Sequence, residues 1–137
     1  MRNIFFTFII AFFASACATA PGTLPEKYNL DNSLEPIEEI SAVKSPSFEL
    51  VDNQSIILRV NWDEYYLLVL RRPVKTRDSN PSIGIDRVVT GVTSGITSGH
   101  DRIYLDSSPG QYYVIDIIYK LKGEKQAEEI KERLRDK

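Results

Sequence analysis

The hydrophobic pattern divides the 137-residue chain into four parts. An apolar run, Ile4–Phe13, interrupted only by Thr7, is followed by a polar stretch that contains prolines. From Phe48 onward apolar and polar residues alternate, which is the period of a strand with one buried face. The segment Glu124–Lys137 is highly charged and carries a narrow apolar stripe at helical spacing. The pattern therefore predicts a leader, a linker, a sheet and a closing helix.

Several segments between residues 56 and 121 have the alternation or the continuous apolar character of strands. Tyr65–Leu70 is apolar on both faces, which favours a central place in a sheet. Pro109 followed by Gly110 indicates a type II turn before the last strand. The expected strands are residues 56–62, 65–70, 83–89, 102–105 and 111–121.

Successive residues of a strand point to opposite sides, so one parity of each strand should face the core. The expected inward residues are Ile56, Leu58, Val60 and Trp62, then Ile103 and Leu105, then Tyr113, Ile115, Ile117, Tyr119 and Leu121. The stripe of the closing helix is Ala127, Ile130 and Leu134. Strands followed by one helix predict an α+β fold: an antiparallel sheet of about five to six strands with one C-terminal helix packed on it.

The segment before the sheet is predicted to be mostly a tether. Residues 18–33 contain few apolar positions and show no period. Leu34, Ile37 and Ile40 recur every three residues, which indicates one helical turn packed on the domain. Pro36 opposes a longer helix. The expected parts are a lipoprotein signal peptide (1–16), a lipidated cysteine and tether with a short ordered segment (17–46), and a single α+β domain (47–137).

The apolar leader ends at Cys17, the only cysteine of the chain. A charged start, an apolar run of this length and small residues before a cut are typical of a secretory signal peptide. A cysteine at the cut makes the leader similar to those of bacterial lipoproteins, in which the thiol is acylated. The alternative is ordinary signal peptidase acting after Ala14-Ser15-Ala16, which would release a soluble chain. The position of Cys17 favours lipidation.

Lipidation would attach the protein permanently, because two or three acyl chains hold a membrane far more firmly than one. In lipoproteins, Asp after the cysteine commonly signals retention in the inner membrane, and this chain has Ala18 there. The sequence therefore predicts a place on the periplasmic face of the outer membrane. The expected partners are the membrane, through the lipid anchor, and an envelope protein that the sequence does not identify.

Charge and composition exclude several classes of function. The 17 basic and 19 acidic residues nearly balance, and no nucleic-acid partner is expected. With Cys17 acylated, no thiol is left for a disulfide. One histidine and scattered acids lack the spacing of metal ligands, so neither a metal nor another cofactor is expected.

His100, the single histidine, is the one candidate for catalysis. A hydrolase would use it as the base, with Asp101 or Asp86 to orient it. Its nucleophile would be Ser94 or Ser98. Sequence neighbours on a strand point to opposite faces, however, and the chain has no Gly-x-Ser-x-Gly motif. We interpret His100 as an exposed loop residue and keep a small envelope hydrolase as the alternative function.

The segment Arg71–Arg77 concentrates positive charge directly after the expected central strand. It suits contact with an anion or a lipid headgroup, at about 1 kcal/mol per cation near a charged surface. We favour the alternative, a solvated strand end whose arginines pair with nearby acids. The cations are Arg71, Arg72, Lys75 and Arg77, and the acids are Asp63, Glu64 and Asp78. Two Asp-Arg steps, at residues 86–87 and 101–102, are interpreted as sources of cross-strand ion pairs.

A series of short motifs occurs in a distinctive order. They are Leu34–Ile40, Tyr66–Pro73, Ser82–Ile85, Asp101–Ile103, and Ile115 with Ile118 before a helix that contains Gln126-Ala127. In this order they resemble a family of small proteobacterial lipoproteins classed only as a domain of unknown function. The resemblance covers residues 34–134 and implies an envelope location, but no activity, cofactor or catalytic residue.

The same resemblance implies a departure in this chain. Relatives carry cysteines at the positions of Val74 and Tyr113. If those cysteines bridge, Val74 and Tyr113 should be near neighbours here. Taken together, the sequence predicts a non-enzymatic, lipid-anchored periplasmic protein that binds or supports an envelope partner.

Overall fold

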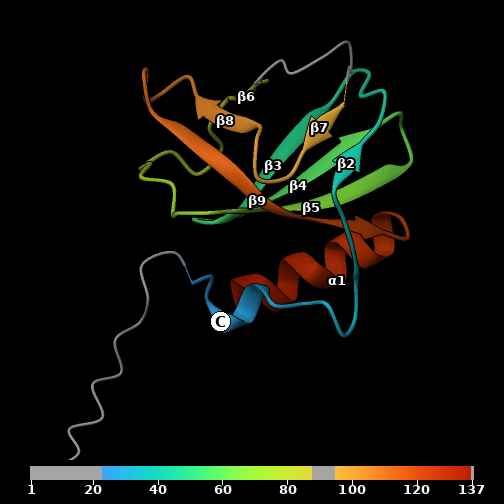
Figure 1. Ribbon diagram of the computed structural model, residues 1–137. Coiled ribbons are helices and arrows are strands. Elements are labelled where there is room, and N and C mark those ends of the chain that lie inside the picture. The colour runs from blue at the N-terminus through green and yellow to red at the C-terminus, as the bar shows by residue number, and fades with distance from the viewer. Residues whose placement is uncertain (1–22, 88–94, 137) are drawn as a thin grey trace, which may run out of the picture.

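The computed structural model describes residues 23–87 and 95–136. In this part of the chain, short strands are followed by one α-helix (Figure 1). The elements are η1 (Glu26–Tyr28), β1 (Glu35–Ile37), β2 (Glu39–Ile40), β3 (Ser47–Asp52), β4 (Ser55–Val60), β5 (Glu64–Leu70), β6 (Ile83–Asp86), β7 (Ile96–Thr97), β8 (Arg102–Leu105), β9 (Tyr112–Leu121) and α1 (Glu124–Arg135). Residues 88 and 89 of the strand expected at 83–89 lie outside the described part.

The strands form a curled antiparallel sheet with α1 packed on one side (Figure 1). The strand order is β3-β4-β5-β9-β8-β6, and β1 also pairs with β9. β2 and β7 form a separate two-stranded ribbon. This is the α+β architecture that the sequence predicts, with β5 in an interior position between β4 and β9.

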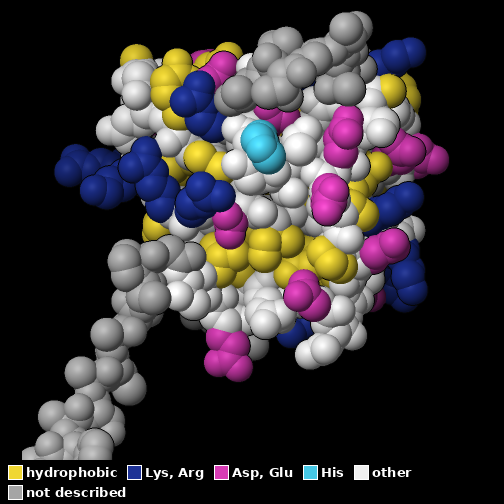
Figure 2. Space-filling model, viewed as in Figure 1, with side chains coloured by type: hydrophobic (Ala, Val, Ile, Leu, Met, Phe, Trp, Pro, Cys, Tyr) yellow, Lys and Arg dark blue, Asp and Glu magenta, His cyan; other side chains and the backbone are white. Residues whose placement is uncertain are grey.

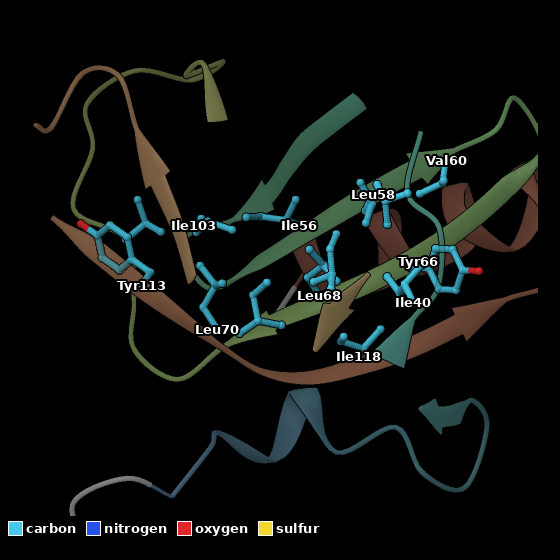
Figure 3. Packing of buried hydrophobic residues seen from close by; sticks show 14 of the residues in the cluster. Ile40, Ile56, Leu58, Val60, Tyr66, Leu68, Leu70, Ile103, Tyr113 and Ile118 are labelled. Carbon is cyan, nitrogen blue, oxygen red and sulfur yellow. The ribbon is translucent and has the colours of Figure 1, made fainter. Parts of the chain in front are cut away.

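Hydrophobic clusters fill both sides of the sheet. The cluster inside the curl includes Ile56, Leu58, Val60, Tyr66, Leu68, Leu70, Ile103, Tyr113 and Ile118 (Figure 3). The cluster under the helix includes Ile57, Tyr65, Leu67, Val69, Tyr119, Leu121, Ala127, Ile130 and Leu134. Alternate residues of β5 enter the two clusters, which confirms that both faces of this strand are buried. The predicted helix stripe is also confirmed.

Strand β9 departs from the predicted single inward face. Val69 of β5 lies opposite Ile117, but the next residue, Leu70, lies opposite Ile115. Asp116 is therefore the extra residue of a β-bulge, which reverses the side to which the following residues point. Tyr113 and Ile115 face the inside of the curl, whereas Ile117, Tyr119 and Leu121 face the helix.

The predicted tether up to residue 33 is wrong, because the chain packs on the domain from Leu24 onward. Tyr28 and Leu30 are buried in the cluster under the helix. The Tyr119 hydroxyl accepts a hydrogen bond from the Leu30 amide at 3.1 Å. It can donate its own hydrogen to the Tyr28 carbonyl at 3.0 Å or to the Asp31 carboxylate at 2.8 Å. These contacts join residues about 90 positions apart in the chain, a relation that no local pattern contains.

The helical turn predicted from Leu34, Ile37 and Ile40 is also wrong. The segment forms two short strands instead, β1 against β9 and β2 against β7. Pro36 fits β1 because an edge strand does not need every backbone N–H. The three-residue spacing arises because the chain passes from one sheet to the other between Ile37 and Glu39.

The segment after β5 runs beside the start of β9, as the resemblance implies. The Arg71 amide donates to the Val114 carbonyl at 2.9 Å, and the Lys75 amide donates to the Tyr113 hydroxyl at 3.3 Å. Val74 and Tyr113 are both buried in the cluster inside the curl. Packing and two hydrogen bonds therefore join the two segments in this chain.

Candidate functional site

His100 lies in the turn before β8 and is exposed, as Figure 2 shows for the cyan side chain. Its Nδ1 lies 3.1 Å from the backbone carbonyl oxygen of Ser98. The Asp101 carboxylate accepts a hydrogen bond from the Thr97 amide at 2.7 Å. Ser94 lies outside the described residues. These two hydrogen bonds involve the backbone of this turn, and neither of them joins the imidazole to a serine hydroxyl or a carboxylate.

Asp86, the second candidate for orienting His100, forms an ion pair with Arg102. The two residues lie directly opposite each other in the pairing of β6 with β8. This confirms a predicted cross-strand ion pair, which joins the Asp of the first Asp-Arg step to the Arg of the second. Asp86 is thus bound to Arg102, whereas Ser98, His100 and Asp101 share the turn before β8.

Trp62 is exposed over 84% of its surface, so the prediction that it faces inward is wrong. Val60 pairs with Glu64, so the residues between them form the turn from β4 to β5. Asn61 and Trp62 have φ angles of 51° and 74°, in the left-handed region that reverses the chain. The alternation therefore stops at Val60. Arg59 holds the turn, because its Nε donates to the Trp62 carbonyl at 2.8 Å.

A hollow of about 450 Å³ lies beside this turn. Its lining residues are Lys44, Ser45, Ser47, Arg59, Asn61 and Trp62, and we call it the Trp62 hollow. The Arg59 guanidinium lies 5.9 Å from the Trp62 ring centroid and 5.7 Å from that of Tyr65. Among the described residues, neither Lys44 nor Arg59 forms an ion pair.

The backbone around the Trp62 hollow holds unusual conformations. Ser45 has a φ of 44°, so three residues of the lining are non-glycine residues in the left-handed region. Such conformations cost roughly 1 kcal/mol or more each and are concentrated at functional sites. An exposed Trp with an adjacent Arg is the combination enriched at the centres of protein-binding surfaces. The arrangement can therefore offer a partner an exposed indole beside the Arg59 guanidinium, with Lys44 lining the same hollow.

The four predicted cations after β5 are exposed, and Figure 2 shows dark blue side chains gathered over this loop. Arg71 pairs with Asp116 at 2.9 Å, and not with Asp63, Glu64 or Asp78 as we favoured. Arg72 donates to the Tyr112 carbonyl at 2.8 Å and lies over the Tyr113 ring, 5.3 Å from its centroid. Within residues 23–87 and 95–136, Arg72, Lys75 and Arg77 form no ion pair.

Two exposed tyrosines extend this positive surface. Tyr104 and Tyr112 lie opposite each other on β8 and β9, with their rings edge to face and their centroids 6.3 Å apart. The Arg102 guanidinium lies 4.6 Å from the Tyr112 ring centroid. Tyr104 also covers Gly84, where an added Cβ would lie 2.2 Å from the phenol ring. We call the set Arg71, Arg72, Lys75, Arg77, Arg102, Tyr104 and Tyr112 the aromatic–basic face.

Sequence reasoning missed Tyr104, Tyr112 and Arg102, although a signal was present. Ile103 and Leu105 are buried as predicted, so Arg102 and Tyr104 must point outward. The same argument from the inward Tyr113 leaves Tyr112 on the surface. The alternation does not show that β8 pairs with β9. This pairing places the outward residues of the two strands side by side.

Within residues 23–87 and 95–136, no three His, Cys, Asp or Glu side chains are grouped as metal ligands would be. Nor does any helix in those ranges have the length and apolar character required to cross a bilayer.

The protein is a small α+β domain built on one curled antiparallel sheet. Its exposed features are the Trp62 hollow and the aromatic–basic face. The chain belongs to the family described as a family of unknown function (DUF6491), which it matches over residues 1–137. Membership of a family without an assigned function agrees with the resemblance found in the motifs. No curated protein and no solved structure matches the chain.

Proposed function

We propose that this protein is a lipid-anchored, non-enzymatic module on the periplasmic face of the outer membrane, where it binds an envelope protein. The leader that ends at Cys17 supports the anchor, and Ala18 supports the outer membrane. The proteobacterial lipoproteins that the motifs resemble support the same location. The observation that carries the binding role is the exposed Trp62 beside its hollow.

The Trp62 side chain would gain free energy if a partner covered it. Its apolar surface is left in water, and burying such surface gains about 25 cal/mol per Å². Arg59 bonds to the Trp62 carbonyl and lies near the Trp62 ring, so the indole is already partly fixed. The Trp62 side chain therefore loses little conformational freedom when a partner covers it. Lys44 and Arg59 would meet carboxylates of the partner at the rim of the contact.

The anchor is tested by metabolic labelling with an alkyne fatty acid. We expect the wild-type protein to take up label and Cys17→Ser to take up none, because Cys17 supplies the only thiol. The matched control is Cys17→Ser combined with Ser107→Cys, which restores a thiol at an exposed turn and should remain unlabelled. Equal labelling of wild type and Cys17→Ser would rule out the anchor.

The binding role is tested by photo-crosslinking in intact envelopes. A photoreactive residue at Asn61, on the rim of the Trp62 hollow, is expected to give a discrete adduct with an envelope protein. Trp62→Ala in the same chain should remove the adduct, since loss of a central Trp costs about 2 kcal/mol or more, roughly thirtyfold in affinity. The same photoreactive residue at exposed Lys125 on α1 is the control. An adduct that persists with Trp62→Ala, or that forms equally from position 125, would contradict the proposal.

A further inference from the structure

The folded domain begins very close to the proposed anchor. The chain packs on the cluster under the helix from Leu24, and Thr23 is the first described residue. Six residue steps separate Cys17 from Thr23. Since an extended chain spans at most about 3.6 Å per residue, Thr23 cannot lie more than roughly 20 Å from an anchored Cys17. An anchor at Cys17 would therefore hold the start of the folded domain within roughly 20 Å of the bilayer.

The aromatic–basic face lies on the side where the chain enters. In Figure 1, the start of the described chain, drawn in blue where the grey trace ends, and the loop after β5 lie on the same side of the molecule. The contacts agree, because the Lys27 and Tyr28 side chains donate to the Asp52 carboxylate at the end of β3. The carbonyl of the next residue, Asn53, accepts from the Val74 amide in the loop after β5. A short connection to Cys17 therefore presents this face, and not another, to the membrane.

The charge of this face suits an anionic surface. Arg71 and Arg102 are offset by Asp116 and Asp86, but Arg72, Lys75 and Arg77 have no carboxylate partner among the described residues. Tyr104 and Tyr112 add two exposed phenol rings, the side chain that concentrates where apolar and aqueous regions meet. Cations beside interfacial aromatics are the composition expected of a surface that lies in the headgroup layer.

We infer that the aromatic–basic face lies on the anionic phospholipid surface next to the anchor and orients the domain there. The inference rests on the proposed lipid anchor for its biological setting. It has a consequence for the binding site as well. Trp62 precedes β5 and Arg71 follows it, so the length of this seven-residue strand sets the two surfaces roughly 20 Å apart. The Trp62 hollow is thereby turned away from the membrane and toward the periplasm.

The test uses the unlipidated chain from Cys17 onward, which contains every described residue, and vesicles with or without phosphatidylglycerol. We expect co-sedimentation with the anionic vesicles that weakens with salt, and little with neutral phosphatidylcholine vesicles. Removing three cations with Arg72→Gln, Lys75→Gln and Arg77→Gln should weaken binding on the order of 100-fold, at about fivefold per cation. The control, Lys120→Gln with Lys122→Gln and Lys125→Gln, removes the same charge at the far end of β9 and should change binding less than threefold.

The single Trp reports the orientation in the same samples. Trp62 fluorescence should remain equally quenchable by acrylamide with and without anionic vesicles. Absence of binding at millimolar anionic lipid, equal losses in the two triple variants, or shielding of Trp62 by vesicles would each overturn the inference. These outcomes do not depend on Cys17 labelling, so the surface can fail while the anchor stands, and the anchor can fail while the surface stands.

Discussion

Ending the chain after Gly123 is expected to remove about 5 kcal/mol or more from the free energy of unfolding, against a typical total of 5–15 kcal/mol. The deleted helix buries Ile130 and Leu134, each contributing about 1.5–3 kcal/mol. Its loss also uncovers Leu67 and Tyr119 on the sheet. The ion pair of Lys131 with Glu49, 2.9 Å, disappears as well. The midpoint of urea unfolding measures the effect.

The control for this deletion ends the chain after Arg135 and keeps the whole helix. It removes only the last two residues and should change stability by less than about 0.5 kcal/mol, as surface changes usually do. A deletion after Gly123 that left the urea midpoint unchanged would mean that α1 is not packed on the sheet.

Asp52→Asn is expected to lower the free energy of unfolding by about 2 kcal/mol at pH 7, because hydrogen bonds to a charged group are the stronger kind. The carboxylate accepts bonds from Lys27 Nζ at 2.8 Å and from the Tyr28 hydroxyl at 2.9 Å, which join the N-terminal segment to the turn after β3. It also accepts bonds from the Gln54 amide at 2.9 Å and the Ser55 hydroxyl at 2.7 Å.

The loss of stability caused by Asp52→Asn should become smaller at low pH. Burial by itself raises the pKa of Asp52, but the bonds from Lys27, Gln54, Ser55 and Tyr28 outweigh it and hold the pKa below its usual value. A carboxyl group with a lowered folded-state pKa stabilises the fold above its unfolded pKa of about 3.9, and this stabilisation is lost as pH falls through the folded pKa. The stability gap between wild type and Asp52→Asn should therefore be constant from pH 7 to about pH 5 and narrow below about pH 4.

Urea unfolding at pH 7 and at pH 3 measures the gap. Asp106→Asn, at an exposed carboxylate in the turn after β8, is the control and should leave stability nearly unchanged at both values. A gap that widened on acidification would show that the Asp52 charge does not stabilise the fold.

The two proposed surfaces give the domain a consistent orientation. A chain held within roughly 20 Å of the bilayer has one side at the membrane and the other available to a partner. The aromatic–basic face and the Trp62 hollow lie at opposite ends of β5, so both roles can be filled at once. In this arrangement the domain holds one protein-binding site at a limited distance above the membrane surface.

Local alternation and spacing were enough to predict much of the fold. β5 is interior and buried on both faces because every residue of Tyr65–Leu70 is apolar or aromatic. The Ser108–Gln111 turn follows from Pro109 and Gly110, since Gly110 has a φ of 80° and the Gln111 amide donates to the Ser108 carbonyl at 3.2 Å. In each case the deciding interaction lies within a few residues of the pattern that predicts it.

Relations between distant segments account for what the pattern could not predict. Tyr28 and Leu30 are buried because Tyr119, far along the chain, bonds to their backbone, so a segment with no period of its own still folds. The extra residue Asp116 reverses the faces of β9 only because β5 lies alongside it. Trp62 continues an apolar alternation but is exposed, since pairing of Val60 with Glu64 ends the strand before it. Periodicity records which side chains gain from burial, whereas strand pairing and long-range hydrogen bonds determine which of them are buried and which remain on the surface to bind a partner.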